Sequence, residues 1–304
     1  MKYFIITVDT EGDNLWEFQK GDIITTNNSI FLPRFQELCN KYAFKPVWLT
    51  NYEMASDQRF VKFAKKEQEE GNCEVGIHIH AWNNPPLYEL NGKCYGNPYL
   101  IEYPKHVMRE KFEVTYNLIK EKFGKAPVTH RAGRWIMNDD YFKLLEEYNI
   151  KVDCSYTPGV SWLNTEGETV TGGCDYRNVF DSSHYIGKVL EVPVTIRKTH
   201  FKKGGSWKSR LKGLVLGTNI WLRPAMSSLQ DMMNLLCRVM EEPECDYVEF
   251  MIHSSELMAG GSPYFKTDES IEKLYDDMNN LFSKAVSLGY KGISLDEYYK
   301  LSKK

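Results

Sequence analysis

Residues 3–13 of this chain, YFIITVDTEGD, decide its fold class. The segment Tyr3–Val8 is rich in apolar and β-branched residues, which predicts a strand. Acidic residues follow at once, at Asp9, Glu11 and Asp13. In α/β barrels the active site lies at the carboxyl ends of the strands. This segment therefore predicts an α/β fold with a polar site at the end of its first strand.

Strand and helix patterns alternate along the rest of the chain. Further strands are predicted at 47–50, 74–80, 128–131, 152–155, 189–194, 247–253 and 292–294, and helices at 30–41, 61–70, 105–123, 141–148, 228–240 and 269–288. Strands separated by helices pair in parallel through right-handed crossovers. About seven such strands predict a distorted (β/α) barrel with one missing or distorted strand. A doubly wound sheet is the alternative, although no G-x-G-x-x-G follows the first strand.

The alternation breaks in one region, from about residue 159 to 224, which is rich in Gly, Thr, Ser, Lys and Arg. We interpret it as an elaborated loop region packed over the barrel, so residues 1–304 are expected to form a single domain. Single barrel domains of about 200–250 residues are common. The basic end of the region is interpreted as solvated surface in preference to a contact for an acidic substrate; it comprises Lys202, Lys203, Lys208, Arg210 and Lys212.

Composition narrows the classes of partner. A formal net charge of −3 gives no long-range attraction for nucleic acid or an anionic membrane. No run approaches the roughly 18–20 apolar residues that span a bilayer, and the first residues lack a signal-peptide pattern, so we expect a cytoplasmic protein without a membrane span. Seven cysteines without a C-x-x-C pair predict reduced thiols. Nothing in the sequence indicates an oligomeric state.

Histidines and charged residues cluster at the carboxyl ends of four of the predicted strands. They occur in DTEGD (9–13), HIH (78–80), HRAGRW (130–135) and HSSE (253–256). Because the carboxyl ends of parallel strands meet at one mouth of a barrel, we expect these segments to converge.

A metal site is predicted from two of these strand ends. Side chains alternate along a strand, so His78 and His80 share one face, and Asp9 and Glu11 share another. Two imidazoles and one carboxylate suit a divalent metal such as zinc and leave coordination positions open for water and substrate. The alternatives are that the histidines are structural and that the acidic segment forms a turn or a helix cap.

Three further roles complete the hypothesis. One of Asp9 and Glu11 should bind the metal, and the other should act as general base. His253, at the end of an apolar strand, is a candidate general acid for a leaving amine, unless it is an ordinary surface histidine. Arg131 is a candidate partner that keeps Asp9 ionised and oriented, unless it forms only a rim ion pair.

Five segments in this order resemble the motifs of the polysaccharide deacetylase family, the NodB-homology or chitooligosaccharide deacetylase-like carbohydrate esterases. They are TVDTEGD (7–13), EVGIHIHAWNNPP (74–86), HRAGRW (130–135), VDCSYTPG (152–159) and EFMIHSSE (249–256). The resemblance spans roughly residues 3–300. It implies a distorted (β/α) barrel, a divalent metal that is commonly zinc, and hydrolysis of N-acetyl or O-acetyl groups on glycans.

The resemblance also assigns roles to single residues. Asp9 matches the catalytic base, Glu11 a metal-binding carboxylate, and His78 the first metal histidine. Arg131 matches the arginine that orients the base, and His253 the general acid.

The chain departs from the family pattern in three places. A second metal histidine is usual at the position of Trp82, and this chain has His80 instead, so we expect His80 to be the third ligand. Thr10 stands where a second Asp is often found. The segment 132–134 replaces common prolines, which predicts a different groove wall.

Three functions remain open on this evidence. The first is metal-assisted removal of an acyl group, most simply N-acetyl, from a carbohydrate or amino-sugar substrate. The second is a glycan-binding protein with an impaired metal site. The third is a glycoside hydrolase that uses Asp9 and Glu11 as paired carboxylates, since neighbours on one strand face lie about 7 Å apart.

Overall fold

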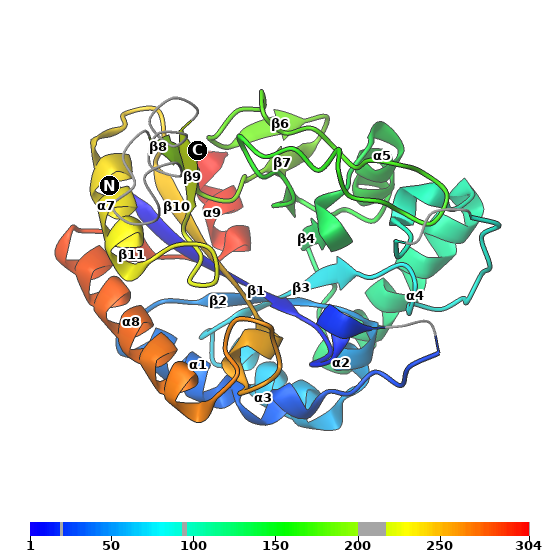
Figure 1. Cartoon of the computed structure of the whole chain (residues 1–304), viewed down its shortest axis with the longest axis horizontal. Coiled ribbons are helices and arrows are strands. Elements are labelled where there is room, and N and C mark those ends of the chain that lie inside the picture. Colours follow the sequence, from blue (N-terminus) through cyan, green and yellow to red (C-terminus); the bar gives the residue numbers. More distant parts are fainter. Residues whose placement is uncertain (19–20, 93–95, 200–216, 304) are drawn as a thin grey trace, which may run out of the picture.

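A curved, mainly parallel β-sheet runs through the centre of the protein, with helices arranged around its outside (Figure 1). The computed structural model describes residues 1–18, 21–92, 96–199 and 217–303. The strand order in the sheet is β10-β1-β2-β3-β4-β5-β7-β6, and β11 pairs with β1. The strands are β1 (Tyr3–Thr10), β2 (Pro46–Thr50), β3 (Glu74–Ile79), β4 (Thr129–Ala132), β5 (Val152–Asp153), β6 (His184–Ile186), β7 (Val189–Glu191), β10 (Tyr247–His253) and β11 (Lys291–Gly292).

The seven strands from β10 to β7 pair in parallel, and only β6 joins the sheet antiparallel. The prediction of about seven parallel strands in a distorted α/β barrel is confirmed. The first strand is longer than predicted: β1 continues to Thr10, so Asp9 lies within the strand and its side-chain direction is set by the pleat.

The helices that cover the sheet begin and end close to the predicted positions. They are α1 (Leu32–Lys41), α2 (Tyr52–Ser56), α3 (Gln58–Glu69), α4 (Lys105–Phe123), α5 (Asp139–Glu147), α7 (Leu229–Glu241), α8 (Asp268–Ser287) and α9 (Leu295–Ser302). Their buried residues repeat at helical spacing, as in α1, where Leu32, Phe35 and Cys39 face the sheet. Two helices were not predicted from the sequence: the short helix α2 and the last helix, α9.

Aromatic packing joins the outer face of the sheet to the helices. The Phe4 ring stacks on Phe44 at 4.6 Å and meets Phe282 of α8 edge-on at 5.6 Å. Such pairs add to the free energy gained by burying their large apolar area. A smaller buried cluster lies on the opposite face, where Met251 of β10 packs with Trp135 and Trp221. Both faces of the sheet are therefore covered, as parallel sheets require.

A hairpin and a single anchored residue span the gap that the sheet leaves open between β7 and β10. The hairpin strands are β8 (Ile196–Thr199) and β9 (Thr218–Trp221), which pair antiparallel. Directly after β9, the Leu222 N–H donates to the carbonyl of Thr195 at 3.0 Å, and the Leu222 carbonyl accepts from the N–H of Met251 at 3.1 Å. These two bonds hold the start of the following loop against β10 near its carboxyl end.

The region 159–224, predicted to be an elaborated loop region, contains more regular secondary structure than expected. The strand predicted at 189–194 is present as β7, and the described part of the region also carries β6, β8 and β9, which were not predicted. The basic residues between 202 and 212 lie outside the described residues. The six described cysteines are all free thiols, in agreement with the prediction. Every helix in the described part of the chain is too short or too polar to cross a membrane.

Candidate metal centre

The strand register brings the predicted site residues to one end of the sheet. Asp9 of β1 is the register partner of His253 in β10, and His78 of β3 is the partner of Arg131 in β4. Partners in neighbouring strands point to the same face. Glu11 follows β1 directly, and His80 follows β3. All six residues of the hypothesis therefore meet where β1, β3, β4 and β10 end.

Glu11, His78 and His80 form a compact group of three potential metal ligands. The two Nε2 atoms of His78 and His80 are 3.0 Å apart. The Oε2 atom of Glu11 is 3.1 Å from Nε2 of His80 and 3.7 Å from Nε2 of His78. Ligand atoms about 2.0–2.1 Å from a tetrahedral zinc ion stand about 3.3 Å from one another. The triangle has the dimensions of one face of such a site.

The protonation of His78 also suits a metal. Its Nδ1 lies 2.9 Å from the carbonyl oxygen of Arg131. A carbonyl can only accept a hydrogen bond, so Nδ1 carries the proton and Nε2 presents its lone pair to the group. Metal-binding histidines are held in this way by a partner on the second ring nitrogen. The residues present therefore fit a divalent cation.

His80 is closely packed by Trp82 and by the backbone at Gly133. Trp82 stacks on it with ring centroids 4.4 Å apart and planes 16° apart. Gly133 directly follows β4, and a Cβ atom at this position would lie 2.2 Å from the carbonyl oxygen of Ile79 and 2.9 Å from Cδ2 of His80. Trp82, at the position where the family resemblance calls for a histidine, thus supports the neighbouring His80.

Two polar residues fix the backbone that carries Glu11. The Ser254 hydroxyl accepts from the Glu11 N–H and donates to the Glu11 carbonyl, both at 3.0 Å. Asn28 Nδ2 donates to the same carbonyl at 2.8 Å. These contacts show that Ser254 anchors the backbone at the end of β1.

The group concentrates negative charge on Glu11. Burial by itself would raise the pKa of this carboxyl, but His253 and His80 outweigh that effect and bring its pKa well below the usual value. The pKa of His78 is raised: burial lowers it, and the nearby carboxylates of Asp9 and Glu11 raise it by more. An ionised carboxylate beside two imidazoles is the donor set that zinc takes.

Arg131 binds Asp9 as predicted. Its Nη1 donates to Oδ1 of Asp9 at 2.6 Å, and its Nε donates to the Cys154 carbonyl at 2.9 Å. Burial tends to raise the pKa of Asp9, and the Arg131 guanidinium reverses this, so the pKa of Asp9 is below its usual value. Asp9 is therefore ionised at neutral pH and oriented by a buried cation.

Glu249 is a second carboxylate on Arg131 that the sequence reading passed over. Its Oε1 accepts from Arg131 and, at 2.7 Å, from the Thr7 hydroxyl. Burial, together with the nearby charge of Asp9, raises the pKa of Glu249 to about 7 despite Arg131. One guanidinium faces two buried carboxylates, and Glu249 is the one that retains its proton toward neutral pH. The sequence did hold a signal for Glu249, because a charged residue inside an apolar strand needs a buried partner.

Replacing Glu249 with glutamine should change how stability depends on pH. The folded-state pKa of about 7 lies above the ordinary value of 4.5, so the native state binds this proton more tightly than the unfolded chain. This group therefore lowers the free energy of unfolding as pH rises from 4.5 to 7, by about 3 kcal/mol in total. E249Q should gain about that much relative to the wild type across the same range.

Urea unfolding at several pH values between 4.5 and 8 measures this difference, with the exposed Glu110→Gln as a matched control. Parallel pH dependences for E249Q and the wild type would rule out a raised pKa at Glu249.

His253 completes the group from β10. Its Nε2 lies 3.8 Å from Oδ2 of Asp9 and 3.9 Å from Oε1 of Glu11, and the Trp16 ring meets it edge-on at 5.0 Å. The His253 side chain is 12 % exposed, which makes it more accessible to solvent than the side chains of Asp9, Glu11, His78 and His80. Arg223 and Glu256, which the sequence reading did not select, contact the other side of its ring.

Other histidines lie apart from this group. His130 precedes Arg131 and points to the opposite face, where Nδ1 is 2.6 Å from Oδ1 of Asp153 and Nε2 is 2.8 Å from the Tyr141 hydroxyl. His106 is exposed, and His184 lies on β6. His200 is outside the described residues. His130 is thus part of the contact between the sheet and α5.

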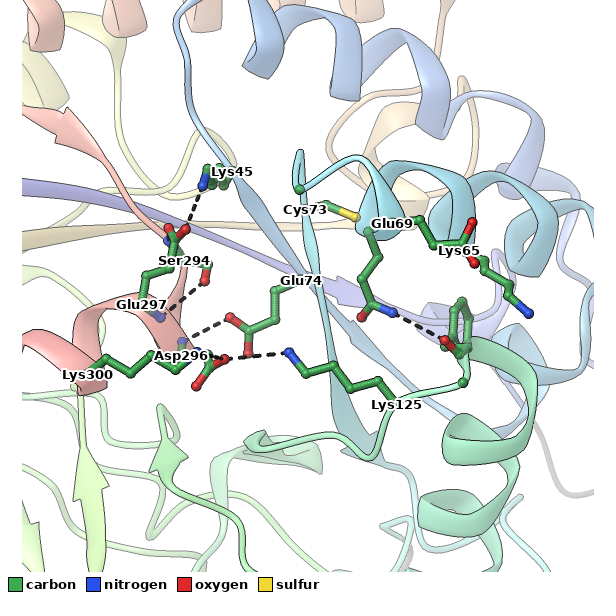
Figure 2. Close-up of a pocket in the computed structure, with 14 residues that line it drawn as sticks. Lys45, Lys65, Glu69, Cys73, Glu74, Lys125, Ser294, Asp296, Glu297 and Lys300 are labelled. Atoms are coloured by element: carbon green, nitrogen blue, oxygen red, sulfur yellow. Dashed lines mark hydrogen bonds and ion pairs between the residues drawn. The ribbon is translucent and has the colours of Figure 1, made fainter.

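A cavity of about 530 Å³ lies at the opposite end of the strands, between the start of β3 and α9 (Figure 2). Its charged residues pair with one another: Lys45 is 2.5 Å from Glu297, and Lys300 is 2.8 Å from Asp296. The buried Glu74 accepts from the Thr129 hydroxyl and from the Asp296 N–H. The amino ends of barrel strands serve stability, so we place the chemistry at the Glu11 end.

Comparison of the sequence with protein-family models and with curated proteins finds no match. Solved structures do resemble it. A protein from Mycobacterium smegmatis, provisionally named a polysaccharide deacetylase, matches with a TM-score of 0.55 and 12 % identity over 99 % of this chain and 92 % of its own. The GH57 branching enzyme of Thermococcus kodakaraensis matches with a TM-score of 0.57 and 12 % identity over 98 % and 71 %.

A 4-α-glucanotransferase from Thermococcus litoralis is also similar, with a TM-score of 0.51 and 10 % identity over 100 % of this chain and 38 % of its own. At these identities the likeness establishes the fold: a curled, parallel half-barrel of the polysaccharide deacetylase type. Because the similar structures carry different chemistries, the function has to be argued from the site.

Proposed function

We propose that this protein is a metal-dependent deacetylase that removes an acyl group, most simply N-acetyl, from an amino sugar or glycan. The observation that carries the proposal is the ligand triangle of Glu11, His78 and His80 beside an aspartate held by a buried arginine. A glycoside hydrolase needs two carboxylates and no such triangle. The order of the five sequence motifs supports the same assignment.

Glu11, His78 and His80 would hold the cation. A divalent ion in such a site polarises the amide carbonyl and lowers the pKa of water. Asp9 is placed to take the proton from the attacking water, because Arg131 occupies its Oδ1 and leaves Oδ2 facing the site. Burial keeps bulk water away and strengthens these interactions.

His253 lies on β10, the neighbour of β1, and its Nε2 faces Asp9 and Glu11. From there it can donate to the departing amine nitrogen as the carbon–nitrogen bond breaks. His253 gives its Nε2 proton to the amine nitrogen, and Asp9, 3.8 Å from Nε2, returns to it the proton taken from water. Water and an amide thereby become a carboxylic acid and an amine, and both side chains return to their starting state.

A carbohydrate substrate fits the residues beside His253. Trp16 contacts the His253 ring, and Tyr264, which is 45 % exposed, meets Trp16 edge-on at 5.6 Å. Aromatic side chains with one face open to solvent suit the apolar faces of sugar rings. Trp16 and Tyr264 are therefore candidates for holding a pyranose beside His253.

Acetate release tests the proposal. Zinc-loaded protein is incubated with N-acetylglucosamine oligomers, and acetate, free amines and reducing ends are measured, with D9N as the inactive control. We expect acetate and free amine in equal amounts and no new reducing ends. Reducing ends without acetate would assign a glycoside hydrolase, and binding of the oligomers without either product would assign a glycan-binding protein.

A further inference from the structure

Arg223 reaches the site from the gap in the sheet. It follows Leu222, whose backbone hydrogen bonds with Thr195 and Met251 hold this segment against β10. The Arg223 side chain is 8 % exposed. Its Nη2 lies 2.9 Å from Nδ1 of His253 and 2.8 Å from Oε1 of Glu256. A buried guanidinium thus stands behind the imidazole that faces the proposed reaction centre.

The direction of this hydrogen bond determines the His253 tautomer. A guanidinium has five N–H donors and no acceptor, so Nδ1 of His253 must accept. The ring proton of the neutral imidazole is then on Nε2. That nitrogen is the one turned toward Asp9 and Glu11, at 3.8 and 3.9 Å.

Glu256 holds Arg223 in place. Its Oε1 accepts from Arg223, and its Oε2 accepts from the backbone N–H of His253 at 3.0 Å. Burial would raise the pKa of Glu256, but the Arg223 charge and contacts with His253 bring it to about 2. The carboxylate stays ionised and connects the arginine to the same turn that carries the histidine.

We infer that Arg223 is a positioning residue that fixes the orientation and tautomer of His253, so that Nε2 is the nitrogen that donates in the reaction. The inference rests on the proposed function for its catalytic meaning. In a serine protease, holding the imidazole in the wrong tautomer lowers kcat about 10⁴-fold. Nothing in the sequence motifs points to Arg223, because it lies in the irregular region before α7.

The variant Arg223→Met removes the donor and leaves Glu256 with its Oε1 3.7 Å from Nδ1. A carboxylate can only accept, so the ring proton should move to Nδ1 and Nε2 should become an acceptor. Histidine-selective ¹⁵N NMR distinguishes the two tautomers directly. Spectra are recorded at pH 8 on zinc-loaded protein, where an ordinary imidazole with a pKa of about 6.5 is neutral, and H253Q assigns the signal.

We expect the Nε2–H tautomer in the wild type and the Nδ1–H tautomer in R223M. Deacetylation should fall at least about 100-fold in kcat, with KM changed less than about threefold, as for a group that acts only in the transition state. Arg223→Lys, which retains a donor, should recover part of the loss. The double variant R223M/E256Q avoids a buried unpaired carboxylate, should R223M fold poorly.

Arg197→Met is the matched control, because Arg197 is also buried and paired with a glutamate, Glu242, and does not touch His253. It should leave the tautomer and kcat unchanged. An Nδ1–H tautomer in the wild type, or an Nε2–H tautomer that persists in both R223M and R223M/E256Q, would overturn the inference. Absence of acetate release by the wild type would count against the proposed function alone, since the NMR result does not depend on turnover.

Discussion

Asp9→Asn is expected to lower kcat for amide hydrolysis by at least about 10³-fold while the protein still binds one zinc ion. General-base catalysis contributes about 10²–10⁴-fold, and an amide cannot take the proton. Asparagine keeps the size of the side chain and an oxygen that can accept from Arg131. Arg131 also keeps Glu249 as a partner, and removing the Asp9 charge favours the ionised form of Glu249, so the buried cation is not left alone.

Steady-state kinetics and metal analysis of the same preparation measure both parts of this result. Asp13→Asn is the matched control: Asp13 lies on the same segment, but its carboxylate accepts from Thr25 and from the Asn27 N–H, away from the site. D13N should keep near-normal kcat. Turnover by D9N at the wild-type rate would remove Asp9 from the mechanism.

His80→Ala is expected to weaken zinc binding by more than about 100-fold. Loss of a residue that merely supports a ligand already costs about 10–100-fold in affinity, and His80 supplies a ligand atom. The variant should also lose the stabilisation by zinc, which for the wild type amounts to about 2.7 kcal/mol when free zinc is 100 times Kd.

Calorimetric titration with zinc and the shift in Tm on adding zinc measure this loss. His106→Ala is the control, because His106 is exposed on α4 and is not one of the three grouped side chains. Equal zinc affinity in H80A and H106A would mean that His80 is not a ligand. The result bears directly on the departure of this chain from the usual motif, in which the histidine falls at Trp82.

The sequence predicted the fold, and it predicted that the candidate site residues lie at one end of the sheet, for one shared reason. Alternation along β1 and β3 fixes which side chains share a face, and parallel pairing brings the strand ends together. Asp9, Glu11, His78 and His80 therefore meet without any knowledge of distances. The structure places them at one end of the sheet, and their roles stay predictions.

Two groups of residues escaped this reasoning for different physical reasons. Glu249 was visible as a charge in an apolar strand on the same face as His253, but its partner Arg131 lies far away in sequence. Arg223 and Glu256 lie outside periodic segments, and single backbone hydrogen bonds of Leu222 place the arginine. No pattern in one sequence reports such a contact. The short strands β8 and β9 were missed because four residues show too little alternation.

Anomalous scattering at the zinc edge, from crystals grown with zinc, tests most directly whether one cation is bound by these three side chains. We expect a single strong peak at the mouth of the barrel, about 2.0–2.2 Å from Oε2 of Glu11 and from Nε2 of His78 and His80. A peak bound by other residues, or no peak at this group in fully zinc-treated crystals, would contradict the metal centre and the hydrolytic mechanism built on it.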